Sequence, residues 1–332
     1  MTALILPLDE VTGRRINIDL AADYLELTAF FASDSTARAS DLANAASVGP
    51  EEGLGELREE MAHGVEEIVT SAVYRIKLRQ KALDSTYPFE LDREGSTVTC
   101  VFKEGSFAHS TYLLSLVLSH LRAVSPVLAD ADLHPNDEEV KRMREYFQYV
   151  ATAALAAEVQ GQAWSFGFPR PDESGFLPKL EEVWQELRDG QVQPQAGAPE
   201  RPKDDQVDVF AARTHGDKLP GFLLAAAQVA TGANAWTKSL KGHLDAFKGR
   251  WFQPQPASAF IPYMIVPFAV GDEKFVDHVR TMGNVLHRLR VPRRVAEAEQ
   301  LALAGVPIEA YDRLPEVASW VTRYRSQARA AA

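Results

Sequence analysis

Apolar residues recur every three or four positions through most of the first half of the chain, a spacing that places them on one face of an α-helix. This spacing predicts four helices, at about 20–32, 57–83, 110–123 and 137–160. Asn136 or Asp137 is expected to cap the last helix, because acidic residues follow in its first turn. Residues 33–55 are rich in Ser, Ala, Gly and Glu and are predicted to form a loop.

Short extended segments are expected at two places in this half, at 89–91 and 97–102. In the second of them apolar and polar residues mostly alternate, which is typical of a half-buried strand. The first 165 residues nevertheless remain mainly helical in this interpretation.

The pattern changes after Pro171, where short apolar runs typical of strands alternate with helical segments. The predicted elements are, in chain order, a helix at 176–188, strands at 206–212 and 221–228, a helix at 235–247, a buried strand at 259–270 and two or three final helices. This order is typical of a small α/β layer sandwich. We therefore expect an α+β protein with a mainly helical domain over 1–165 and an α/β domain over 172–332.

Composition is that of an ordinary globular protein, with 332 residues of which 46% are apolar and 24% charged. The single cysteine, Cys100, excludes a disulfide framework and a Cys-rich zinc site, and its apolar strand predicts a buried thiol. No apolar run is long enough to cross a membrane. The first ten residues are apolar but lack a basic region, so we expect no signal peptide and a cytoplasmic protein.

Charge is distributed unevenly along the chain, whose net charge is −11. Residues 236–332 hold 14 Lys and Arg and 9 Asp and Glu, a balance of +5, which leaves −16 for residues 1–235. This basic third is either solvated charge or a surface that meets phosphate. Its densest run holds Arg288, Arg290, Arg293 and Arg294, which either bind phosphate or complement the dipole of a helix C-terminus.

Four familiar motifs are missing from the sequence: GxxxxGK[ST], GxGxxG after a strand, HExxH and GxSxG. Their absence disfavours P-loop nucleotide hydrolases, dinucleotide enzymes, zinc proteases and α/β-hydrolases. His215 and Asp217 lie between two predicted strands, either in a polar hairpin loop or near a site if the loop folds back.

The strongest chemical signal is a carboxylate inside an apolar strand. Asp208 alternates with Val207 and Val209, and its desolvation is costly unless a cation or a donor meets it. The next strand ends in Gln228. Oxygens from two adjacent strands can hold Mg²⁺, which takes one or two carboxylates and keeps several waters. The alternatives are a surface acid at the strand edge and an amide that closes a strand end.

Residues 205–209 (DQVDV) and 226–238 (AAQVATGANAWTK) resemble the restriction-endonuclease-like PD-(D/E)xK nucleases, over about 175–270. The resemblance implies a mixed sheet flanked by helices and cleavage of DNA that depends on Mg²⁺ or Mn²⁺. Many members of the superfamily act in restriction or anti-phage defence. The resemblance matches Asp208 to the metal-binding aspartate and Gln228 to the Glu or Gln of the second strand. The preceding helix often supplies a Glu, and Glu181 is preferred to its neighbour because it borders the apolar face.

The chain departs from the family pattern at Ala230, where a lysine is expected two residues after Gln228. Lys238 and Lys241, in the segment after the strand, are the candidates to replace it. Lys238 points away from the packed face of the predicted helix, but it can reach the site if the first turn is not helical. The expected site therefore combines the ligands Asp208, Gln228 and Glu181 with the amine of Lys238 or Lys241.

Two functions follow from this interpretation. The first is a nuclease whose helical half recognises substrate, a partner or a trigger. The second is a catalytically degenerate binding subunit of a defence complex, in which a partner such as an ATPase does the work; Ala230 favours this alternative. An unrelated α/β interaction protein is a third. Oligomerisation is possible in each case, and no membrane contact is expected.

Overall fold

The computed structural model describes residues 4, 18–47, 55–128 and 133–331. The chain forms two compact units, unit 1 (1–140 with 317–332) and unit 2 (141–316). These boundaries differ from the expected division at 165 and 172. The reason is long-range pairing, because strand β4 (Gln162–Ser165) pairs with β5 (Val209–Arg213) and so belongs to unit 2.

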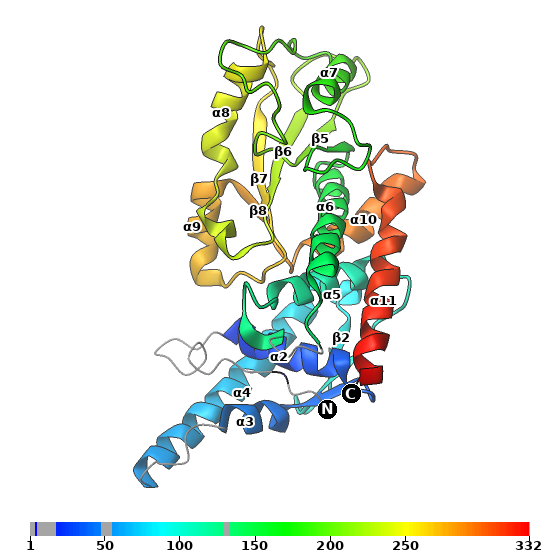
Figure 1. Cartoon of the computed structure of the whole chain (residues 1–332). Helices are drawn as coiled ribbons and strands as arrows, with labels where there is room; N and C mark the ends of the chain where they lie inside the picture. The colour runs from blue at the N-terminus through cyan, green and yellow to red at the C-terminus, as the bar shows by residue number, and fades with distance from the viewer. Residues whose placement is uncertain (1–3, 5–17, 48–54, 129–132, 332) are drawn as a thin grey trace. The chain divides into compact units, whose positions relative to one another are not determined.

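Unit 1 combines helices with a three-stranded antiparallel sheet in the order β1-β3-β2. Its elements are α2 (Ile18–Phe31), β1 (Thr36–Arg38), α3 (Ala39–Ser47), α4 (Gly55–Leu83), η1 (Asp84–Thr86), β2 (Phe89–Leu91), β3 (Thr97–Cys100), α5 (Phe107–Ser119) and η2 (Pro126–Leu128). Figure 1 shows them in the blue and cyan part of the ribbon. The predicted helices and strands of this region are confirmed, and Cys100 is buried as expected. The loop predicted over 33–55 is wrong, because β1 and α3 form within it.

A fully buried arginine lies at the centre of unit 1. The Arg79 guanidinium contacts carboxylate oxygens of Asp19, Asp23 and Glu26 at 2.7, 2.5 and 2.7 Å. Three further side chains complete this network, which we call the Arg79 cluster: the Tyr87 and Tyr112 hydroxyls donate to Glu26, and His120 pairs with Asp23. A buried charge persists only when it is paired and hydrogen-bonded, so the cluster joins α2, α4 and α5.

Replacement of Arg79 by methionine is expected to lower the free energy of unfolding by about 3–5 kcal/mol, because the buried carboxylates lose their cation. Denaturant titration of the full chain measures this change. The matched control is Lys81→Met, an exposed position on the same helix, which should change the free energy by less than about 0.5 kcal/mol. Equal effects of the two substitutions would contradict the role given to the Arg79 cluster.

Unit 2 contains a five-stranded mixed sheet in the order β4-β5-β6-β7-β8. Strands β4, β5 and β6 (Leu223–Val229) pair antiparallel, whereas β6, β7 (Phe260–Ile265) and β8 (Asn284–Leu286) pair parallel. The expected strand at 206–212 begins only at Val209, because Asp205 and Gln206 adopt positive φ angles of 46° and 68° and form a turn. The short strands β4 and β8 were not predicted.

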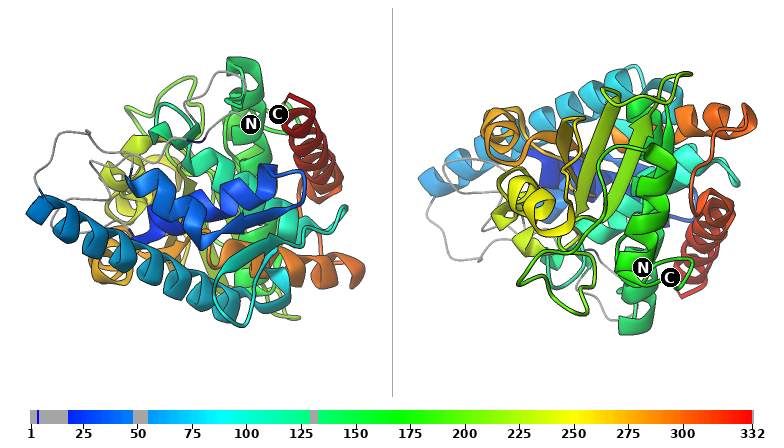
Figure 2. Two further views of the ribbon diagram at one scale, coloured as in Figure 1. Left: turned by 90° about the horizontal axis from the view of Figure 1, so that it is seen from below. Right: turned by 90° about the horizontal axis from the view of Figure 1, so that it is seen from above.

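Helices cover both faces of this sheet. The remaining elements of the chain are α6 (Asp137–Val159), α7 (Phe176–Leu187), η3 (Ala233–Thr237), α8 (Leu240–Trp251), α9 (Asp272–Met282), α10 (Val291–Leu303), η4 (Tyr311–Arg313) and α11 (Leu314–Ala331). From residue 317 on, α11 belongs to unit 1. Helices α7 and α8 pack on one face through Trp184, Phe210 and Phe247. Helix α9 lies on the same side (Figures 1 and 2). On the other face, Glu158 of α6 contacts Tyr263 of β7 and Arg294 of α10.

The chain is therefore a mixed α/β protein, as expected from its pattern. Asn136 caps α6, because its side-chain oxygen accepts from the backbone N–H of Glu139, whose carboxylate in turn accepts from the backbone N–H of Asn136. Within the part of the chain that the structure describes, no helix combines the length and the apolar character that a membrane span needs.

Candidate functional site

The direction of the strands gathers several chain ends at one edge of the sheet in unit 2. Strands β6, β7 and β8 are parallel and end together, and β5, which is antiparallel to β6, begins there. We call this the carboxyl edge. Asp208 immediately precedes β5, and Gln228 is the penultimate residue of β6. Ligands of α/β sheets commonly bind outside the carboxyl ends of the strands.

Asp208 is held in place through both its backbone and its side chain. Its carboxylate oxygen Oδ2 accepts a hydrogen bond of 2.7 Å from the backbone N–H of Val229, and its own N–H donates to the carbonyl of Ala227 at 2.8 Å. Its carbonyl oxygen accepts from three donors: the N–H groups of Phe166 and Gly167 and the side-chain amide of Gln148. The bond from Val229 ties the Asp208 carboxylate to the backbone at the end of β6.

The environment of Asp208 opposes its negative charge. The pKa of its carboxyl is raised to about 7, chiefly by burial and then by the Asp204 carboxylate, whereas the Val229 N–H and the Lys238 ammonium lower it. Near neutral pH the proton is therefore held weakly. A second cation close to this carboxylate would favour its ionised form.

Gln228 presents a buried acceptor without a partner. Its side chain is 5% exposed, and its oxygen Oε1 accepts no hydrogen bond from the described residues. An unpaired buried acceptor costs free energy that a cation or a donor would recover. This oxygen therefore does not close the strand end by accepting a bond from the described backbone. Its Oε1 remains available as an oxygen ligand.

The structure separates the two candidate lysines. The helix expected from residue 235 begins at Leu240, and Lys238 lies before it in an extended conformation with φ −92° and ψ 146°. The Lys238 charge lowers the pKa of Asp208. Lys241 is exposed and donates to the carbonyl of Arg280 at 3.0 Å. Of the two, Lys238 is therefore the lysine whose charge acts on Asp208, whereas Lys241 contacts α9.

Two residues at positions singled out by the resemblance, Ala230 and Glu181, do not contribute side chains to the carboxyl edge. Ala230 is 2% exposed and packs against Met264, so its side chain points into an apolar cluster. Glu181 is exposed on α7 and is absent from the groups that shift the pKa of Asp208. The structure thus does not bring Glu181 to Asp208, because an acid at the border of an apolar helix face can equally point into solvent. Among the described residues, no group of three or more His, Cys, Asp or Glu is placed to hold a metal ion.

The basic run of the C-terminal third is largely engaged inside unit 2. Arg294 pairs with Glu158 and Glu297, and the Arg290 guanidinium lies over the Phe275 ring at 4.4 Å. Arg288 is fully buried. The run precedes and opens α10, so the interpretation as a helix C-terminus is wrong.

Other candidates contribute no site. His215 and Asp217 lie in an exposed loop, where Asp217 accepts from the N–H of Leu219, as in a polar hairpin loop. The pKa of the Cys100 thiol is raised by burial, which leaves it inert.

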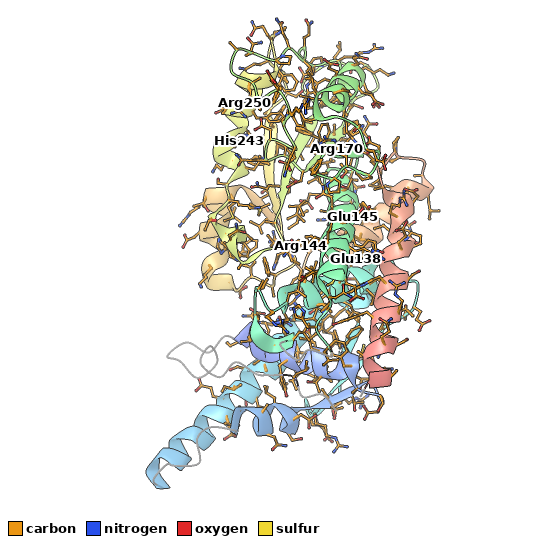
Figure 3. All side chains as sticks on the ribbon, viewed as in Figure 1. Glu138, Arg144, Glu145, Arg170, His243 and Arg250 are labelled. Atoms are coloured by element: carbon orange, nitrogen blue, oxygen red, sulfur yellow. The ribbon has the colours of Figure 1, made fainter. Side chains whose placement is uncertain are left out.

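Sequence analysis missed the residues that position the turn before Asp208. The Asp205 carboxylate accepts from Arg250 at 2.6 Å and from the Trp251 indole at 2.6 Å, and it lies 3.4 Å from His243. His243 and Arg250 come from α8 (Figure 3). Asp205 looks like an exposed loop acid in the sequence, and no local pattern indicates that its partners lie 38 to 46 residues further on.

Comparisons with protein-family models, curated proteins and solved structures found no match for this chain.

Asp208→Asn is expected to change how stability depends on pH. In the wild type, the folded carboxyl has a pKa of about 7 and the unfolded one an ordinary pKa near 3.8. Between these values the folded chain binds more protons, so the free energy of unfolding falls as pH rises, by roughly 2–4 kcal/mol in total. Asparagine does not titrate, so the free energy of unfolding of Asp208→Asn should not fall in this way as pH rises. Denaturant titrations of both proteins from pH 4 to 9 in EDTA measure the two free energies. If they differed by the same amount at every pH, the raised pKa of Asp208 would be contradicted.

Proposed function

We propose that unit 2 is a metal-dependent nuclease that hydrolyses phosphodiester bonds of DNA at the carboxyl edge. The observation that carries the proposal is the combination of the Asp208 carboxylate, the unpartnered oxygen of Gln228 and the Lys238 ammonium at the start of β5 and the end of β6. The resemblance to PD-(D/E)xK nucleases matches Asp208 and Gln228 to the metal-binding positions, which supports the same assignment.

The oxygen donors fit a hard divalent cation. Mg²⁺ and Mn²⁺ favour carboxylate and carbonyl oxygens, and Mg²⁺ is commonly held by one or two carboxylates while it keeps several waters. Gln228 offers an acceptor that lacks a partner, and Asp208 uses Oδ2 for Val229. A bound ion of this kind supplies Lewis-acid stabilisation at phosphorus and activates water. Because Glu181 is exposed on α7, Asp208 and Gln228 are the protein ligands we propose.

The chain's own residues supply position and charge. The hydrogen bond from Val229 fixes the Asp208 carboxylate, and the turn at Asp205 fixes the approach of the chain to it. The Lys238 ammonium provides the positive charge that the family takes from a strand lysine, and it would stabilise the negative charge that develops on a phosphate. Asp204 adds a negative charge beside Asp208, which further favours a cation there.

A second function keeps the binding role without catalysis. The exposed position of Glu181 and the apolar surroundings of Ala230 favour a degenerate subunit that binds DNA or a partner such as an ATPase. A place in anti-phage defence, in the cytoplasm, fits either function. Cleavage assays separate the two.

Purified protein with Mn²⁺ or Mg²⁺ is expected to cleave plasmid DNA or single-stranded DNA. Asp208→Ala should reduce the rate by at least about 100-fold and Lys238→Met by about 10–100-fold, because each removes charge at the reacting phosphate. Lys241→Met is the matched control and should stay within about twofold of the wild type, since Lys241 contacts α9 instead. Cleavage that survives Asp208→Ala overturns the site, and a protein that binds DNA without cleaving it is the degenerate subunit.

Metal binding should also be visible without catalysis. Mg²⁺ or Mn²⁺ is expected to raise the melting temperature of the wild type, because an ion that binds only the folded state stabilises it by about 2.7 kcal/mol at 100 times its Kd. Asp208→Asn keeps the size of the side chain and removes its charge, so its melting temperature should not respond. An equal shift in both proteins would show that the ion binds elsewhere.

A further inference from the structure

Beside Lys238 lies a group of aromatic side chains that the proposed chemistry does not use. Trp236 and the imidazole of His278 stack with ring centroids 4.1 Å apart and planes at 25°, and Trp236 lies 6.0 Å from Phe268. We call Trp236, Phe268, Phe275 and His278 the ring patch. They come from η3, from the chain after β7 and from α9, all at the carboxyl edge of the sheet.

The ring patch differs from the core of unit 2 in its exposure. Core rings such as Phe210, Phe247 and Trp251 are at most 1% exposed, whereas every member of the ring patch is only partly buried. The patch covers a small cluster whose interior is already filled by side chains such as Met264 and Val285. Single exposed apolar residues are ordinary on protein surfaces. A group of large rings that all remain in contact with water instead indicates a binding surface.

Basic side chains lie beside the ring patch. Lys238 is two residues from Trp236, Lys274 and Arg280 lie on α9, and the guanidinium of Arg290 covers the Phe275 ring at 4.4 Å. Helix α9 also carries three acids, Asp272, Glu273 and Asp277, and the last of them pairs with Arg280 at 3.2 Å. Burial and Lys274 lower the pKa of His278, so its ring is neutral at pH 7 and stacks as an aromatic group.

We infer that the ring patch stacks unpaired bases, so that the ligand of the carboxyl edge is single-stranded nucleic acid or a frayed end. This inference deepens the proposed function and rests on it for the role of Asp208. Aromatic rings beside Lys and Arg are what single strands require, since each base offers a flat face to a ring and each phosphate a charge to a cation. A continuous duplex hides its base faces. A base on Trp236 leaves the neighbouring phosphate on the side of Lys238 and Asp208.

The test measures binding apart from cleavage. Fluorescence anisotropy of labelled 12-nucleotide oligo(dT), oligo(rU) and a blunt duplex is followed with the Asp208→Asn protein in EDTA. We expect the single strands to bind at least about 10-fold more tightly than the duplex. Added to this background, Trp236→Leu should weaken single-strand binding about 10-fold and leave duplex binding unchanged, while Trp236→Phe should keep most of it.

Two further variants distinguish the loss of base stacking from a general loss of folding. His278→Ala removes the stacked partner of Trp236 and should also weaken single-strand binding, although His278 lies outside the apolar cluster. Trp164→Leu, at a partly buried tryptophan on β4, is the matched control and should leave binding unchanged. Equal affinity for duplex and single strand, or no effect of Trp236→Leu and His278→Ala, overturns the inference.

The two proposals fail separately. Cleavage of duplex DNA that depends on Asp208, without a preference for single strands, removes the stacking inference and leaves the nuclease. Single-strand binding that depends on Trp236, without cleavage of any substrate in Mg²⁺ or Mn²⁺, removes the nuclease and leaves the stacking surface.

Discussion

The arrangement of the carboxyl edge depends on the pairing of β6, which is antiparallel to β5 on one side and parallel to β7 on the other. If β5 ran parallel to β6, Asp208 would lie at the opposite edge of the sheet from Gln228. The strand has the small residues Ala225, Ala226 and Ala227 at its centre, and all three are fully buried. Small side chains there leave room for large rings such as Trp184 and Phe247 from the helices, which fill the core beside the strand.

The fold also places two polar side chains, Asp208 and Gln228, in surroundings that are energetically unfavourable for them. Burial and Asp204 disfavour the ionised form of Asp208, while the bond from Val229 orients the carboxylate toward the end of β6. Gln228 adds an acceptor without a donor. The buried carboxylate and the unpaired Gln228 oxygen cost stability in the absence of a cation, and such costs are typical of functional sites.

Local periodicity predicted the long elements, such as α4 and β6, because the spacing of apolar residues within each element is enough to define its apolar face. It missed β1, β4 and β8, which have three or four residues and are stabilised by partners distant in the sequence. Asp208 and Gln228 could be proposed as candidates because a polar residue next to a run of apolar ones is visible locally. The choice between Lys238 and Lys241 needed the true start of α8, and Glu181 failed because a helical wheel does not show what faces it.

The Arg79 cluster has a consequence for the history of the chain. Its members come from separate segments, and a replacement of any one leaves a buried polar group without its partner. A single substitution at any position of the cluster therefore destabilises the protein. Substitution of one apolar residue by another around the cluster costs little stability. In diverged relatives these positions should covary or stay constant. They would then trace descent after most of the surrounding sequence has changed.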